Sequence, residues 1–187
     1  MRKKLFSIAV CGLCMMLSGQ TRPTTQPGGF SDTAVTEARI QDLRGMNYLH
    51  ATQRTTIRQM NQTLGVDIEK MLAAMRANSI SPAGPMMLIM KGMTQNPEQP
   101  FSLDFGFDVA RGSTAPAGYQ ITELPAYHCA SVIFSGPMTN IGMAYHQIYS
   151  SIFGAGIMPT PESREYVLYW EAPDSANNVF MIAVGIP

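Results

Sequence analysis

Two segments of the chain carry apolar residues at the spacing of an amphipathic helix. In residues 62–78 the series begins at Leu64 and recurs at +4, +7, +8 and +11. In residues 139–154 the same series begins at Ile141, 77 positions later. This spacing places the apolar side chains on one side of a helix. The sequence therefore predicts two related helices.

Apolar and polar residues alternate in the segments that flank these helices, as they do in half-buried strands. The clearest alternation runs through residues 101–110 and, in the same phase, through residues 178–186. We predict strands around the first helix at 37–44, 46–56, 86–92 and 101–110, and around the second at 119–124, 127–135, 164–171 and 178–186. Each half thus has the order strand, strand, helix, strand, strand.

The two halves also match each other beyond the helices. Ile80 and Pro82 correspond to residues 157 and 159 at the same offset of 77, and residues 39–43 resemble residues 120–124 at an offset of 81. We therefore predict a tandem duplication, with repeat one at 37–110 and repeat two at 119–187. The predicted fold class is α+β, with antiparallel sheets each covered by one long helix. A pseudo-twofold arrangement of this kind leaves a ligand cleft between the halves.

The first twenty residues have the layout of a signal peptide. Basic residues 2–4 precede an apolar run at 5–17, and small residues follow at 18–19. We expect cleavage near residue 20 and export to the periplasm or the medium. The run is shorter than the ~20 residues of an ordinary spanning helix, so no stable span is expected after cleavage, although a retained N-terminal anchor stays open. Residues 21–36 are rich in Thr, Pro and Gly and predict a flexible linker.

The charge of the chain is unevenly distributed between the leader and the body. The chain has 13 Lys and Arg against 13 Asp and Glu, but three basic residues belong to the leader. The body therefore keeps ten basic and thirteen acidic residues, and we expect no nucleic-acid partner. Only Cys129 remains outside the leader, so no intramolecular disulfide is expected. The oligomeric state stays open.

Several segments of the second half resemble, in their order and spacing, the GyrI-like small-molecule-binding family, also met as the effector-binding domain of AraC-type and MerR-type regulators. They are ITELP at 121–125, YHCASVIFSGP at 127–137, AYHQIY at 144–149, EYVL at 165–168 and AVGIP at 183–187. The resemblance extends more weakly over residues 37–187. It departs from the family at Met138, where an aromatic residue is common. No DNA-binding helix-turn-helix is predicted in this chain.

The resemblance places the family's pocket glutamate at Glu165. Alternation puts Glu165 on one strand face with Val167 and Tyr169, and puts Tyr166, Leu168 and Trp170 on the other. A carboxylate among aromatic rings suits a cationic or hydrogen-bonding organic ligand. The offset of 77 gives Glu165 the counterpart Leu88, so the predicted site is asymmetric. The predicted ligand-binding residues are Glu165, Tyr145, Tyr149, Tyr169, Trp170, Tyr127 and Tyr48.

Other functions stay open. Some members of the family hydrolyse electrophilic compounds, and Glu165 would then be the catalytic base. SOUL-type haem proteins share the duplicated architecture, and His146 could ligate a haem. Met87, Met90 and Met93 form an M-x-x-M-x-x-M pattern that could hold copper(I), and free sheet edges could dock a protein partner. We nevertheless predict a binder of an amphipathic or cationic small molecule, with no cofactor and no metal.

Overall fold

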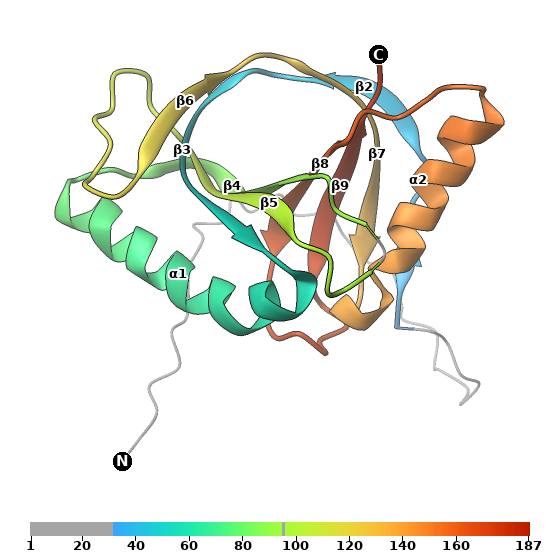
Figure 1. Cartoon of the computed structure of the whole chain (residues 1–187), viewed down its shortest axis with the longest axis horizontal. Helices are drawn as coiled ribbons and strands as arrows, with labels where there is room; N and C mark the ends of the chain where they lie inside the picture. Colours follow the sequence, from blue (N-terminus) through green and yellow to red (C-terminus); the bar gives the residue numbers. More distant parts are fainter. Residues whose placement is uncertain (1–31, 95) are drawn as a thin grey trace, which may run out of the picture. The chain divides into compact units, whose positions relative to one another are not determined.

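The computed structural model describes residues 32–94 and 96–187 (Figure 1). The predicted signal peptide and all but the last residues of the predicted linker lie outside this range. The helices are α1 (Ile57–Ala77) and α2 (Gly142–Gly154), the latter preceded by a 3₁₀ turn at Met138–Asn140. The strands are β1 (Ala34–Val35), β2 (Arg39–Leu43), β3 (Met46–Thr55), β4 (Pro82–Lys91), β5 (Phe101–Val109), β6 (Gln120–Leu124), β7 (Tyr127–Ser135), β8 (Glu162–Tyr169) and β9 (Val179–Gly185).

These strands form one antiparallel sheet in the order β1-β7-β9-β8-β4-β5-β3-β6, and β2 also pairs with β7. The α+β class is confirmed, but the separate sheets expected for the two halves are a single sheet, because β4 pairs with β8 across the middle. β1, which falls in the predicted linker, pairs with the C-terminal end of β7.

Two bent strands cross one face of the sheet. β2 continues into β3, and β6 continues into β7, with bends near Gly45 and Pro125. The two bent strands pair with each other before and after the bend: β2 pairs with β7, and β3 pairs with β6. The register does not change at the bend, because Leu43 lies opposite Tyr127 and Met46 lies opposite Leu124. A Cβ on Gly45 would lie 2.7 Å from the carbonyl oxygen of Leu124, so only glycine fits at this close crossing. In Figure 1 the bent strands arch over the remaining strands.

The two helices cover the opposite face, which we call the helix face. Met71 and Met75 of α1 pack with residues of β3, β4 and β5, and Ile148 and Ile152 of α2 pack with residues of β7 and β9. The face under the bent strands, which we call the inner face, holds a third cluster that includes Tyr48 and Tyr166. The sheet therefore separates two buried environments.

Local signals explain where α1 begins. Thr56 accepts a hydrogen bond from the backbone N–H of Gln59, and the Gln59 side chain accepts one from the backbone N–H of Thr56. This capping box satisfies two N–H groups that a helix start leaves free. It starts α1 at Ile57, five residues before the start predicted from periodicity.

Equivalent strands of the two halves lie at equal distances from the centre of the sheet. The first half contributes β4, β5 and β3 on one side of the β4–β8 pair, and the second half contributes β8, β9 and β7 in the same order on the other side. The duplication itself stays a prediction from the sequence. In the described part of the chain, no helix is both long enough and apolar enough to cross a membrane.

Candidate ligand-binding site

Glu165 lies at the centre of the sheet, on the helix face. Its neighbour across β4 is Leu88, and its neighbour across β9 is Ile182. Leu88 belongs to the α1 cluster and Ile182 to the α2 cluster, so the carboxylate sits at the boundary of two apolar cores. Only 5% of Glu165 is exposed. The residue matched to Glu165 by the offset of 77 is therefore also its direct partner in the sheet.

Burial gives this carboxylate unusual properties. It raises the pKa of Glu165 above its ordinary value, and the hydrogen bond from Tyr145 partly offsets the rise. The Tyr145 hydroxyl donates to Glu165 Oε1 at 2.6 Å, a length typical of a bond to an ionised acceptor. Burial and the nearby carboxylate together raise the pKa of Tyr145 well above its ordinary value. Tyr145 is thus a fixed donor to Glu165.

The aromatic rings of α2 lead from this carboxylate to the surface. Tyr145 stacks on Tyr149 with ring centroids 6.4 Å apart, and Tyr149 stacks on Phe153 at 5.9 Å. The spacing of four residues brings these side chains to one side of the helix. Phe153 is 55% exposed, whereas Tyr149 is half-buried. We call these three residues the aromatic ladder.

The ladder joins two of the predicted site residues to Glu165, but four others lie elsewhere. Tyr48 and Tyr127 are on the inner face, where their hydroxyls donate to the backbone oxygens of Met87 and Glu162 at 2.7 and 2.8 Å. Tyr169 and Trp170 are about half exposed at the end of β8. The structure therefore gathers Glu165, Tyr145 and Tyr149 and places Tyr48 and Tyr127 on the opposite face of the sheet.

Strand irregularity explains the placement of Trp170. Alternation predicts it on the face opposite Glu165, but its ring meets Phe180 edge-on at 6.2 Å, and Phe180 belongs to the α2 cluster. The register between β8 and β9 shifts between Val167 and Tyr169, which ends the strict alternation. That prediction for Trp170 was wrong.

Arg164 points away from Glu165. Its Nε and Nη2 both donate to Glu162 Oε1 at 2.8 Å, and its guanidinium lies 3.7 Å from the centre of the Tyr127 ring. Only 4% of Arg164 is exposed. The described structure therefore contains no ion pair between Arg164 and Glu165. No Lys, Arg or His among the described residues forms an ion pair with Glu165.

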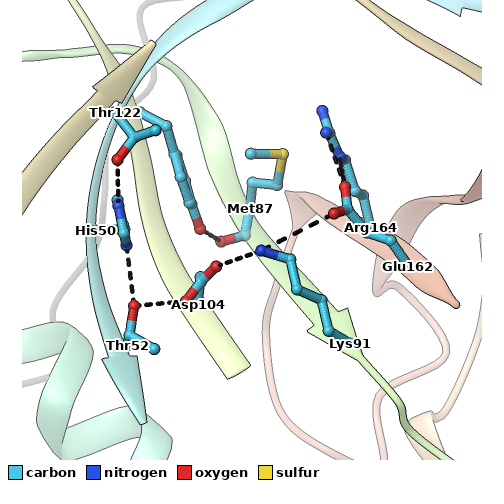
Figure 2. A network of polar contacts seen from close by, with 9 residues as sticks. His50, Thr52, Met87, Lys91, Asp104, Thr122, Glu162 and Arg164 are labelled. Atoms are coloured by element: carbon cyan, nitrogen blue, oxygen red, sulfur yellow. Dashed lines mark hydrogen bonds and ion pairs between the residues drawn. The ribbon is translucent and has the colours of Figure 1, made fainter. Parts of the chain in front are cut away.

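The inner face also carries a polar network that sequence reasoning missed (Figure 2). Thr52 donates to Asp104 at 2.6 Å, and His50 contacts Thr52 and Thr122 through its two ring nitrogens at 3.4 and 3.0 Å. Lys91 extends the network from Asp104 toward β8. The signal available in the sequence was that polar residues recur in one phase of strands whose other phase is apolar.

The structure also shows where the residues of the predicted copper and haem alternatives lie. Met87 packs on the inner face and Met90 on the helix face, so these two thioethers cannot share one copper ion. His146 is exposed on α2. Over residues 32–94 and 96–187, no group of three or more His, Cys, Asp or Glu side chains is placed to hold a metal ion.

A family model described as the GyrI-like small molecule binding domain matches residues 36–185. The match defines the class as a small-molecule-binding domain. The chain belongs to the GyrI-like family. None of the curated proteins compared with the chain matches it.

Solved structures show the same fold. The C-terminal domain of EcmrR matches with a TM-score of 0.67 and 17% identity, over 81% of this chain and 97% of that domain. In the EcmrR–DNA complex the match (TM-score 0.67, 18% identity) covers 80% of this chain but only 57% of the EcmrR chain. SAV2435 bound to tetraphenylphosphonium gives 0.55 at 9% identity, over 81% and 94% of the two chains. A hydrolase from Listeria innocua gives 0.55 at 7%, over 81% and 92%.

Proposed function

We propose that this chain binds an amphipathic organic cation at Glu165, with the aromatic ladder as the apolar part of the site. The observation that carries the proposal is a buried carboxylate whose one hydrogen-bonding side-chain partner in the described structure is the neutral hydroxyl of Tyr145. A structural carboxylate at such a place is normally paired with a cation, because an uncompensated buried charge is costly. Here the ligand would supply that charge.

The surroundings favour a cation with apolar substituents over a metal ion. The side chains beside Glu165 on the neighbouring strands are aliphatic, and those beyond Tyr145 are aromatic. Aromatic faces attract organic cations by about 0.5–2 kcal/mol each. The tetraphenylphosphonium bound to SAV2435 has this chemistry, which supports the same class of ligand for the present chain.

The ladder provides a route from the surface. Phe153 is exposed, Tyr149 is half-buried, and Tyr145 reaches the carboxylate. A flat or branched aromatic cation that replaces solvent on Phe153 and Tyr149 would have its charge drawn toward Glu165. Rotation of Tyr145 away from Oε1 would open direct contact with the carboxylate.

Titration of the protein with tetraphenylphosphonium tests the proposal. Calorimetry should give a saturable heat for the wild type, and Glu165→Gln should weaken binding at least tenfold, because it removes the charge and keeps the shape. Glu69→Gln, an exposed residue of α1, makes the same change in net charge and should bind like the wild type. Triphenylphosphine oxide, of similar shape but uncharged, should bind much more weakly than the cation. Equal binding by Glu165→Gln and wild type would refute the assignment.

The affinity should also depend on pH with a defined sign. Burial raises the pKa of Glu165, and the cation prefers the ionised form. Binding should therefore strengthen as the pH rises through that pKa and release a proton in this range. In Glu165→Gln the pH dependence should disappear.

A second candidate is hydrolysis of an electrophilic small molecule. A carboxylate with a raised pKa, as Glu165 has, is a better general base at neutral pH than an ordinary one. Incubation with a strained electrophile such as an epoxide distinguishes the two functions. More than one product molecule per protein, lost in Glu165→Gln and kept in Glu69→Gln, would favour the enzyme.

We further propose that residues 1–20 direct export and that the folded part acts outside the cytoplasm. The proposal rests on the basic and apolar pattern of the leader alone. Expression with a C-terminal tag, cell fractionation and N-terminal sequencing would test it. An unprocessed N-terminus in the cytoplasmic fraction would contradict it.

A further inference from the structure

The inner face holds a cavity near the C-terminal end of β8, separate from the proposed cation site. Its volume is about 220 Å³. Its apolar lining comes from Leu43, Met46, Pro85, Leu168 and Met181. Tyr166, which also lines it, follows Glu165 on β8, so the two side chains point to opposite faces of the sheet. An apolar cavity of roughly 150 Å³ can bind benzene, so this one has room for a ring with a short substituent.

The cavity lies beside an irregular stretch of β4. The register between β4 and β5 shifts between Pro82 and Met86, and the cavity residues Gly84 and Pro85 fall in this stretch. A Cβ built on Gly84 would come within 4 Å of Asp108 alone, at 3.6 Å from its Cβ. This is an ordinary packing distance, so a side chain at position 84 would fit there and fill space. The space beside Asp108 is therefore open because residue 84 has no side chain.

Asp108 contributes a buried carboxylate to the wall of this cavity. Only 6% of the residue is exposed. Its Oδ2 accepts a hydrogen bond from Nη2 of Arg44 at 2.6 Å, whereas Oδ1 has no hydrogen-bond partner among the residues that the structure describes. A carboxylate oxygen can accept two hydrogen bonds, and an acceptor that is buried without a partner is costly. Oδ1 is therefore available to a donor that a ligand supplies.

The charge of Asp108 is already compensated, which limits the kind of donor. Arg44, whose side chain is 71% exposed, forms the ion pair with Asp108. An anionic ligand would be repelled by the carboxylate, and a cationic ligand would add a second positive charge to a pair that is already neutral. An uncharged hydroxyl adds no charge, and the hydrogen bond that it donates is stronger to an ionised acceptor than to a neutral one. The cavity therefore favours an uncharged donor.

We propose that this inner-face cavity binds a small uncharged alcohol with an apolar body, such as an arylalkyl alcohol or a short aliphatic one. The ring or chain of the ligand would occupy the space between Met46, Leu168 and Met181. The hydroxyl would donate a hydrogen bond to Oδ1 of Asp108. This site is independent of cation binding at Glu165.

Benzyl alcohol is a suitable probe because it joins one ring to one hydroxyl donor. With ¹³C-methyl methionine labelling, titration should shift the methyl signals of Met46 and Met181 saturably. Toluene has no hydroxyl, and benzyl methyl ether can accept a hydrogen bond but cannot donate one. Each should bind about fivefold more weakly than benzyl alcohol or worse, as expected for the loss of one hydrogen bond.

Variants of the cavity wall test the role of Asp108. Asp108→Asn replaces a charged acceptor by a neutral one, so it should weaken benzyl alcohol about fivefold and leave toluene unchanged. Glu98→Gln makes the same change in the Arg58–Glu98 pair, which has the same length of 2.6 Å outside the cavity, and should have no effect. Gly84→Val should weaken both ligands, because its side chain would fill the space beside Asp108.

Further readouts separate this proposal from misfolding and from the cation site. The three ligands are compared on the wild type, so that comparison holds even where a variant fails to fold. Glu165→Gln should bind benzyl alcohol like the wild type, and Asp108→Asn should bind tetraphenylphosphonium like the wild type. Four results would each overturn the proposal: no saturable methyl shift, benzyl methyl ether binding as tightly as benzyl alcohol, an equal effect of Asp108→Asn on benzyl alcohol and toluene, or tighter binding of benzylammonium or benzoate than of benzyl alcohol.

Discussion

The bond between Tyr145 and Glu165 can be tested by the replacement Tyr145→Phe. The change keeps the ring that stacks on Tyr149 and removes only the hydroxyl that donates to Oε1 at 2.6 Å. The effect depends on the protonation state of Glu165. When the carboxyl is ionised, the variant loses a bond to a charged acceptor, worth about 1.5–3 kcal/mol. When it is protonated, the loss is that of a neutral bond, about 0.5–1.5 kcal/mol.

The difference between these two limits sets the magnitude. The variant should lose about 1–2 kcal/mol more stability at high pH than at low pH. For a domain of this size that corresponds to roughly 2–8 °C in the melting temperature. Burial raises the pKa of Glu165 and the Tyr145 bond lowers it, so the variant should have a still higher folded-state pKa. A carboxyl with a raised folded-state pKa loses stability as the pH rises from its unfolded value to its folded value. The additional loss in Tyr145→Phe therefore grows as the pH rises through the interval between the two folded-state pKa values.

Urea denaturation of both proteins between pH 4 and pH 8.5 measures this dependence. Tyr149→Phe, one turn further along α2, should show no such pH dependence. In the background of Glu165→Gln, the effect of Tyr145→Phe should become independent of pH. A destabilisation by Tyr145→Phe that is equal at both ends of the range would refute the reasoning, since it would mean that the hydroxyl does not interact with an ionisable carboxyl.

Three further changes test the fold that holds the site. Gly106→Ala should destabilise the protein by more than about 3 kcal/mol or prevent folding, because the new Cβ would overlap the carbonyl oxygen of Leu49; a soluble variant with wild-type urea stability would contradict this. Ile148→Ala, at a fully buried position of α2, should cost about 2–5 kcal/mol in urea denaturation, and a cost below that range would mean that the α2 core repacks. Thr56→Ala removes the cap of α1 and should cost about 1 kcal/mol, whereas Thr56→Ser should stay close to the wild type; equal losses in both would exclude capping as the cause.

Much of the fold could be predicted because its elements have strong periodic signals. The apolar series in both helices and the alternation in residues 101–110 and 178–186 are local properties of the chain. The predictions that failed involve features that are not periodic. The register shift after Val167 turned Trp170 toward the α2 core, and the pairing of β4 with β8 joined the halves into one sheet. Neither follows from the residues of a single strand.

For the candidate site, too, some features could be predicted from the sequence and others could not. By itself the sequence determined the α+β class, the two helices and the order of the strands along the chain, and through a resemblance it proposed Glu165 as a ligand-binding residue. Only the tertiary structure decided that Glu165 faces Leu88 between two cores, that Tyr145 reaches it, and that Arg164 is on the other face. The physical reason is that periodicity assigns a side chain to a face, whereas its partners depend on strand register and on which elements cover that face. Those are set by long-range pairing, such as the crossing of the bent strands at Gly45.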